Sequence, residues 1–140
     1  MTDYVCGFMR DDHNDVALVR KIKPKWQAGS LNGIGGAIES GEQPLDAMRR
    51  EWTEETGNVW VDWNQFAQLL VGDSIIYFFK AGVGKLPSFP THNDIGEAIE
   101  VLPYDVAIRI PTGGMIQNLK WLLPMAFEDP DAKANVMMAA

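Results

Sequence analysis

The stretch GAIESGEQPLDAMRREWTEETG, from Gly36 to Gly57, decides the fold of this 140-residue chain. Its last third places one arginine and three glutamates within the six residues Arg50 to Glu55. In a helix, residues three or four positions apart share a face, so Glu51 would meet both Glu54 and Glu55. Three carboxylates gathered in this way repel one another unless a cation lies between them. Because Mg²⁺ and Mn²⁺ prefer oxygen ligands, the pattern indicates a site for a divalent metal ion.

The same stretch carries the signals of a helix from Pro44 to about Gly57. Proline suits the first helical position, and Asp46 adds negative charge near the positive end of the helix dipole. Glycine at position 57 is a typical C-terminal stop. An apolar stripe that can pack on a sheet recurs at positions i, i+3 and i+7, namely Leu45, Met48 and Trp52. The glutamates therefore lie beside the expected buried stripe and not on it.

Two interpretations of the glutamates compete at this point. An acidic helix face is most often simply solvated. Here, however, a glycine-rich segment leads into the helix and can bring backbone close to the acidic face. Glycines stand at positions 33, 35, 36 and 41. These glycines favour a metal-binding site over a simply solvated acidic surface.

The arrangement of glycines and charges resembles the Nudix box, the signature of the Nudix hydrolases. Gly36 is followed after five residues by Glu42 and, after seven more, by Arg50-Glu51-Trp52-x-Glu54-Glu55-x-Gly57. The box would span residues 36–58. The resemblance implies that the metal ligands are Glu51, Glu54, Glu55 and the carbonyl of Gly36. It further implies that Arg50 and Glu42 orient the cluster, with structural support from Gly41 and Gly57.

The resemblance also implies how the site works. Hydrolysis of a phosphoanhydride requires charge neutralisation on the polyphosphate and a water molecule aimed in line at phosphorus. The group that accepts the water's proton stays open between Glu51, Glu54 and an acid from a later loop. For that further acid we expect Glu97, with Asp94 and Glu100 as alternatives. We expect Mg²⁺ as the cofactor, and Mn²⁺ would suit the same ligands.

Substrate contacts are expected at three places. Residues 31–36 resemble the branch that hydrolyses oxidised purine nucleoside triphosphates, which implies that Asn32 hydrogen-bonds the base. The basic run with Arg20, Lys21 and Lys23 either meets substrate phosphates or is a solvated loop. Near the C-terminus, Asn118 could read a base edge, since an amide both donates and accepts. Trp121 could stack on the base, but packing in the core is the interpretation that we favour.

Length and composition indicate one soluble domain over residues 1–140. The formal charge of −7 argues against a protein that binds nucleic acid, which would need a basic surface. Cys6 is the one cysteine, so no intramolecular disulfide can form and a reducing compartment is expected. No apolar stretch is long enough for a membrane span, and we expect a cytoplasmic protein without membrane contact. The oligomeric state stays open, a homodimer included.

The remaining pattern predicts strands on both sides of the long helix. We expect a hairpin from 4–9 and 16–19, further strands at 59–62, 68–71, 74–80 and 99–102, and a second helix from 115 to about 123. Pro124 should end or kink that helix, and the tail 128–140 should be flexible. These elements make an α/β fold with a mixed sheet packed between helices. The resemblance implies the same α/β/α sandwich.

From these observations we expect a Mg²⁺-dependent pyrophosphohydrolase with a nucleotide substrate. It would cleave a nucleoside triphosphate, with an oxidised or modified deoxynucleotide as one candidate, to the monophosphate and pyrophosphate. An alternative keeps the mechanism and changes the substrate to a nucleoside diphosphate derivative, such as ADP-ribose, a sugar nucleotide or a dinucleoside polyphosphate. A second alternative is a nucleotide-sensing module without catalysis.

Overall fold

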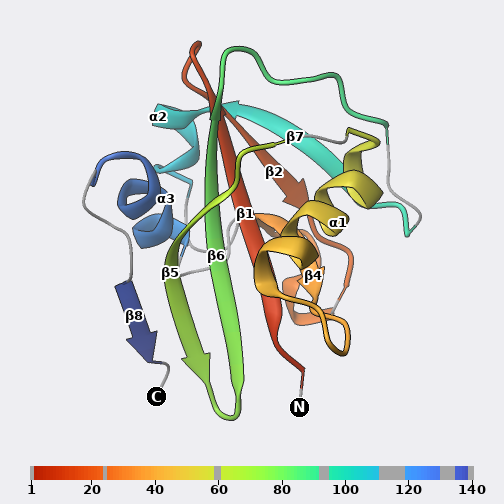
Figure 1. The fold of residues 1–140 in the computed structure, drawn as a ribbon. Helices are drawn as coiled ribbons and strands as arrows, with labels where there is room; N and C mark the ends of the chain where they lie inside the picture. The colour runs from red at the N-terminus through yellow and green to blue at the C-terminus, as the bar shows by residue number, and fades with distance from the viewer. Residues whose placement is uncertain are drawn as a thin grey trace.

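The computed structural model describes residues 2–23, 25–58, 61–91, 95–110, 119–129 and 135–138 (Figure 1). The strands in these ranges are β1 (Tyr4–Asp11), β2 (Asp15–Arg20), β3 (Leu31–Asn32), β4 (Ile34–Ala37), β5 (Asn64–Val71), β6 (Ser74–Val83), β7 (Ala98–Pro103) and β8 (Asn135–Met138). The helices are η1 (Lys25–Gln27), α1 (Pro44–Thr56), α2 (Tyr104–Ala107) and α3 (Leu119–Phe127).

Within the described ranges, the eight strands form one mixed sheet in the order β3-β2-β1-β6-β5-β8. Strand β4 pairs with β1, and β7 pairs with β2. The pairs β1–β6 and β5–β8 are parallel, and the other pairs are antiparallel. The predicted mixed sheet is therefore confirmed.

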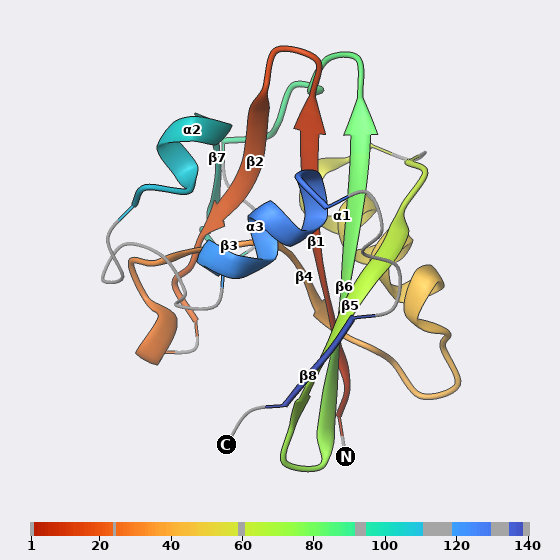
Figure 2. The ribbon, with the colours of Figure 1, turned by 90° about the vertical axis from the view of Figure 1, so that its left-hand side faces the viewer.

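Strand β1 lies inside the sheet and is covered on both faces. Side chains alternate along a strand, so Cys6 and Phe8 point to one face while Val5 and Met9 point to the other. Helix α1 packs on the face of Val5 and Met9, and helices α2 and α3 pack on the opposite face (Figure 2). This arrangement confirms the α/β/α sandwich.

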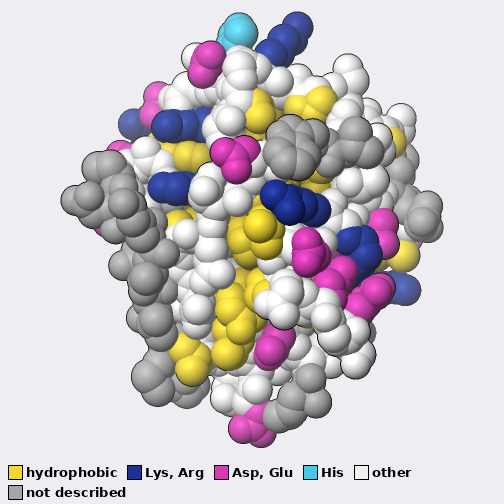
Figure 3. Space-filling model, viewed as in Figure 1, with side chains coloured by type: hydrophobic (Ala, Val, Ile, Leu, Met, Phe, Trp, Pro, Cys, Tyr) yellow, Lys and Arg dark blue, Asp and Glu magenta, His cyan; other side chains and the backbone are white. Residues whose placement is uncertain are grey.

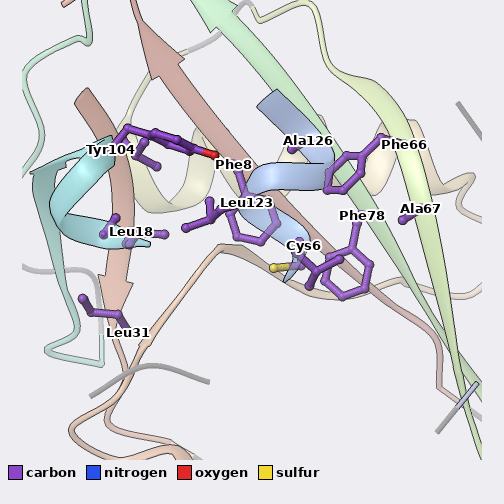
Figure 4. Packing of buried hydrophobic residues seen from close by; sticks show 13 residues of the cluster. Cys6, Phe8, Leu18, Leu31, Phe66, Ala67, Phe78, Tyr104, Leu123 and Ala126 are labelled. Carbon is purple, nitrogen blue, oxygen red and sulfur yellow. The ribbon is translucent and has the colours of Figure 1, made fainter. Parts of the chain in front are cut away.

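The face under α2 and α3 has an aromatic centre. Phe8, Phe66 and Phe78 lie with ring centroids 6.2–6.3 Å apart. Leu123 of α3 and Tyr104 of α2 close over them (Figure 4). This layer packs α3 against the face of the sheet.

The face under α1 holds the predicted apolar stripe of that helix. Met48 and Trp52 are fully buried, and Leu45 packs at the margin of the same cluster. The Trp52 ring meets Trp63 edge-on with centroids 5.6 Å apart, and it meets Phe89 edge-on at 5.9 Å. Burial of the stripe sets the rotation of α1, so the glutamates beside the stripe point away from the core.

Near the C-terminus the sequence predicts that Pro124 ends or kinks a helix, and the structure shows that it does not end it. Pro124 lies inside α3 and does not end it, since the helix continues to Phe127 and Glu128 N–H bonds Pro124 O at 2.7 Å. The burial of Leu122, Leu123 and Ala126 compensates for the hydrogen bond that proline removes. The start of this helix was expected at 115, which lies outside the described residues.

Other elements also depart from the prediction. Residues 135–138 of the tail, expected to be flexible, form β8 beside β5. Val61 and Asp62 are not part of a strand, and residues 59 and 60 lie outside the described ranges. The short helix α2 was not expected. None of the helices in the described part of the chain is both long enough and apolar enough to cross a membrane.

Replacement of Gly57 by alanine should destabilise the protein. Gly57 ends α1 with φ of 74°, and its N–H bonds Thr53 O at 2.8 Å. A Cβ atom is unfavourable in this left-handed conformation, so Gly57→Ala should lower the free energy of unfolding by roughly 1–2 kcal/mol. Chemical denaturation checks this result. Gly82→Ala is the matched control, because a Cβ there meets nothing within 4 Å and φ lies outside the left-handed region; an equal loss in both variants would contradict the prediction.

Candidate functional site

Helix α1 presents a charged face whose centre is Arg50. The Arg50 guanidinium donates to both carboxylate oxygens of Glu42, from Nε at 2.9 Å and from Nη2 at 2.9 Å. Its Nη2 also donates to the carbonyl of Ala37 at 2.9 Å. Arg50 therefore ties α1 to the loop that leads from β4, in the two-pronged geometry that suits guanidinium and carboxylate.

The remaining guanidinium nitrogen of Arg50, Nη1, lies between two glutamates of the same helix. Nη1 donates to Glu51 Oε1 at 3.0 Å and lies 3.2 Å from Glu54 Oε2. The carboxylates raise the pKa of Arg50 above its ordinary value, with Glu42 as the largest cause. On the face that carries α1, Figure 3 shows the same grouping of acidic side chains around basic ones. Arg50 thus supplies the positive charge that lets Glu51 and Glu54 share one side of the helix.

The two glutamates have different environments. The Glu51 side chain is 13% exposed and the Glu54 side chain is 57% exposed. Burial raises the pKa of Glu51 above its ordinary value, and the hydrogen bond from Arg50 opposes this shift. Neighbouring charge on Glu54 and Glu55 raises the pKa further. Burial therefore makes the Glu51 carboxylate easier to protonate than an ordinary exposed glutamate.

Strand β4 approaches the acidic face at Gly36. A Cβ atom at this position would overlap the Glu51 carboxylate, so a larger residue would require that side chain to move. Gly36 also pairs with Val5 of β1, which fixes its position in the sheet. The backbone of β4 and the Glu51 carboxylate are consequently neighbours, as the sequence pattern predicted.

The oxygen donors gathered here fit a hard divalent cation in their chemistry. They comprise carboxylates on successive turns of α1 and the backbone beside Gly36. In the described part of the chain, however, no three acidic, histidine or cysteine side chains are already positioned to hold one ion together. The position of Arg50 Nη1 accounts for this, because it draws Glu51 and Glu54 toward the guanidinium.

Glu42 is held in a tight turn before α1. Its Oε1 accepts the N–H of Glu39 at 3.0 Å, and its own N–H donates to Glu39 O at 3.0 Å. Gly41 completes the turn with φ of 79°. The hydrogen bonds from Arg50 and from Glu39 lower the pKa of Glu42 to about 2. Glu42 therefore stays ionised and keeps Arg50 in place.

Most of the basic run is paired with acids of the segment that leads into β7. Arg20 binds Glu100 through two hydrogen bonds of 2.6 and 2.9 Å and also reaches Gly29 O. Lys21 Nζ lies 3.2 Å from Glu97 Oε1. Lys23 is exposed and has no ion pair among the described residues. Of these three cations, Lys23 is thus the one with its charge available to a ligand.

The structure does not favour Glu97 as the further catalytic acid. Its side chain is 1% exposed, and its Oε2 accepts the N–H groups of Ile22 and Lys23. Burial alone would raise the pKa of Glu97, but these N–H groups and Lys21 lower it below its ordinary value. These hydrogen bonds connect the Glu97 carboxylate, which lies just before β7, to the backbone that follows β2. Glu100 is engaged by Arg20, and Asp94 lies outside the described residues.

Asn32 is fixed by its neighbours on β1 and η1. Its Oδ1 accepts the N–H of Gly33 at 2.7 Å and faces Cys6 Sγ at 3.6 Å, while its Nδ2 donates to Gln27 Oε1 at 3.0 Å. Because the Gly33 N–H can only donate, the amide orientation of Asn32 is settled. Asn32 therefore offers a donor rather than a free carbonyl. Burial raises the pKa of Cys6 to about 12, so its thiol stays protonated.

Asn118 and Trp121, near the C-terminus, were the two residues considered for contact with the nucleotide base. Asn118 lies outside the described residues. Trp121 is 65% exposed, so the favoured interpretation of core packing is wrong. The buried side of α3 is formed by Leu122 and Leu123, which leaves Trp121 facing outward.

The sequence did not single out Gln27 or the Ala37 carbonyl. Every residue has a backbone carbonyl, so the sequence cannot indicate which carbonyl makes a contact. Gln27 belongs to no motif or repeating pattern that would indicate its role.

Known proteins share the fold of this chain. A family model of the NUDIX domain matches residues 2–135. The crystal structure of a MutT protein from Bacillus halodurans has a TM-score of 0.75 at 19% identity, covering 100% of this chain and 91% of that chain. A MutT protein from Methanosarcina mazei has a TM-score of 0.70 at 16% identity, covering 93% and 95%. Identities this low establish a shared fold alone.

One curated relative is similar over part of its sequence. The 8-oxo-dGTP diphosphatase of Escherichia coli is 37% identical over 51 residues, which are 36% of this chain and 40% of that enzyme. The match therefore spans less than half of the length of the relative.

The Glu42–Arg50 pair predicts a specific loss of stability in acid. The pKa of Glu42 is about 2 in the folded protein and near 4.5 in the unfolded chain. Its contribution is therefore complete above about pH 4.5 and is lost as the pH falls toward about 2. Glu42→Gln should be less stable than wild type at neutral pH, and the difference should shrink between about pH 5 and about pH 3. Denaturant titrations across this range measure it; a difference that does not change with pH would contradict the assignment.

Proposed function

Because the chain belongs to the Nudix hydrolase family, whose members are pyrophosphohydrolases, we propose that it cleaves a nucleoside triphosphate with Mg²⁺ as cofactor. The products would be the nucleoside monophosphate and pyrophosphate. An oxidised or modified deoxynucleotide is the substrate that we favour. The observation that carries this proposal is the Arg50 network, which places Glu51 and Glu54 on one helix face against the glycine of β4.

The metal ligands in this proposal are the carboxylates of Glu51, Glu54 and Glu55, with the Gly36 carbonyl. When bound, a divalent ion would neutralise charge on the polyphosphate, Mg²⁺ being our choice and Mn²⁺ a substitute. Arg50, held by Glu42, keeps the ligand side chains in orientation as their outer support. The raised pKa of Glu51 makes it our candidate for the group that accepts the proton of the attacking water.

Substrate binding draws on residues around the end of β2. We assign the phosphate contact to Lys23, because Arg20 and Lys21 are paired with Glu100 and Glu97. Arg20 and Lys21 would instead hold the loop that carries Lys23. Asn32 would donate from Nδ2 to an acceptor on the base, since its oxygen is already engaged. Asn118 and the exposed Trp121 remain candidates for the base contact.

The choice of a triphosphate is supported by one similarity. The E. coli relative is named 8-oxo-dGTP diphosphatase, and its similarity reaches 37% identity in the matched segment. A nucleoside diphosphate derivative would use the same metal chemistry, and the products distinguish the two: pyrophosphate supports the triphosphate, whereas AMP with a phosphorylated sugar supports the derivative. The presence of every acid of the motif argues against a module without catalysis.

Replacement of Glu54 by glutamine should remove turnover and leave the fold intact. The amide keeps the shape of the side chain but loses the charge that a divalent ion requires, so kcat should fall on the order of 10²-fold or more. Steady-state hydrolysis of a nucleotide panel with Mg²⁺ measures this. Glu39→Gln is the matched control, since Glu39 is an exposed glutamate that also lies 3.7 Å from Arg50 but belongs to the loop before α1. Full activity in Glu54→Gln would refute the metal site.

Binding of a divalent ion should stabilise the folded protein. An ion between the carboxylates would take over the charge that Arg50 Nη1 now supplies to Glu51 and Glu54. Mn²⁺ at about 100 times its Kd should add about 2.7 kcal/mol to the free energy of unfolding, and chelation should remove the gain. Thermal unfolding with and without EDTA measures the effect. The same shift in Glu54→Gln/Glu55→Gln would show that the ion binds elsewhere.

A further inference from the structure

A cavity lies on the opposite face of the sheet from α1, where β1, β5 and β6 meet the end of α3. Its volume is about 320 Å³, which is within the range of small-molecule sites. The sheet side is lined by Arg10, Asn64, Lys80 and Gly82, and the helix side by residues 126–129. Figure 2 shows α3 crossing this face toward β1 and β6. The sheet separates the cavity from the Arg50 network.

The sheet side of the cavity continues the aromatic layer with charged residues. Arg10 follows Phe8 on β1, and Lys80 follows Phe78 on β6, each two positions later and therefore on the same face. The parallel register places Lys80 beside Phe8 on the neighbouring strand. Two cations thus stand where the apolar core of this face ends.

Lys80 has no counter-ion within the part of the chain that the structure describes. None of the ion pairs there includes its ammonium group, although the residue is only partly exposed. A partly buried charge is less stable without a partner than with one. The ammonium group is therefore available to an anionic group in the cavity.

Arg10 is positioned by aromatic rings rather than by an acid. Its guanidinium carbon lies 4.8 Å from the centroid of Phe127 and 5.6 Å from that of Tyr104. Its hydrogen bond to Asn14 is long, at 3.5 Å. These ring contacts hold the guanidinium, and none of the ion pairs among the described residues includes it, so it can pair with a carboxylate.

The helix side of the cavity has the opposite charge. Glu128 accepts the hydroxyl of Tyr104 at 2.6 Å, which fixes its carboxylate, and Asp129 lies next to it in the lining. The carbonyl end of α3 adds negative potential at the same place. The cavity thus has a basic wall on the strands and an acidic wall at the end of the helix.

We propose that this cavity binds a small zwitterion of amino-acid type, with its carboxylate against Arg10 and Lys80 and its ammonium group against Glu128. Each charged group of such a ligand meets the wall of opposite sign, as complementary binding requires. Ala126 and Phe127 provide the apolar part of the lining, so an apolar side chain on the ligand fits best. This site is separate from hydrolysis and does not depend on the proposed substrate.

Three matched ligands test, on the full chain, whether the cavity recognises both the carboxylate and the ammonium group. L-leucine carries both charges, N-acetyl-L-leucine only the carboxylate, and L-leucine methyl ester only the ammonium group. Chemical-shift titrations of the backbone amides should show L-leucine binding at residues of the cavity. Each blocked probe should bind at least about tenfold more weakly, because a hydrogen-bonded charge is lost. No binding of L-leucine, or equal binding of either blocked probe, would overturn the proposal.

Two variants locate the site. Lys80→Met removes the charge and keeps the length of the side chain, and Gly82→Val fills the cavity, since a Cβ there meets nothing within 4 Å. Both should weaken L-leucine binding by about tenfold or more while nucleotide hydrolysis is unchanged. Lys85→Met, an exposed lysine that does not line the cavity, is the control and should bind as wild type does. Wild-type affinity in both Lys80→Met and Gly82→Val would place the ligand elsewhere and refute the assignment.

Discussion

The ion pairs of Arg50 are the interaction on which the charged face of α1 depends. Without a positive charge at this point, Glu51 and Glu54 could not share one side of α1 at low energetic cost. The same guanidinium holds Glu42 and the Ala37 carbonyl, so the loop after β4 and the helix are positioned together. One side chain therefore sets both the electrostatic balance of the site and the path of the backbone beside it. The acidic side chains of this face are therefore arranged around one cation of the protein itself, Arg50.

The α1 half of the molecule could be predicted from local sequence because its signals are local. Proline at 44, the apolar spacing of Met48 and Trp52 and glycine at 57 all act within one helix, and the structure confirms that helix. Other features depend on contacts that are distant in the sequence. The sheet face buries the neighbours of Pro124 inside α3, and the Glu97 carboxylate accepts N–H groups more than 70 residues away. Neither contact can be read from the residues around these positions.

The sheet divides the protein into two chemically different sides. Alternation along β1 sends Cys6 and Phe8 to one side and Val5 and Met9 to the other, so each side has its own core. The α1 side combines a buried stripe with the acidic cluster. The α3 side ends in charged residues of both signs around a cavity. Substitutions on one side can therefore alter its chemistry while the packing of the other is preserved.

Strand β8 has a consequence for how copies of this protein meet. It pairs in parallel with residues 67–70 of β5, which would otherwise stand at the border of the sheet. An uncovered border strand offers a row of unmatched N–H and C=O groups that can recruit a strand from another molecule. Strand β8 replaces this border with its own, which is four residues long where β5 has eight, so a shorter edge is offered to another molecule.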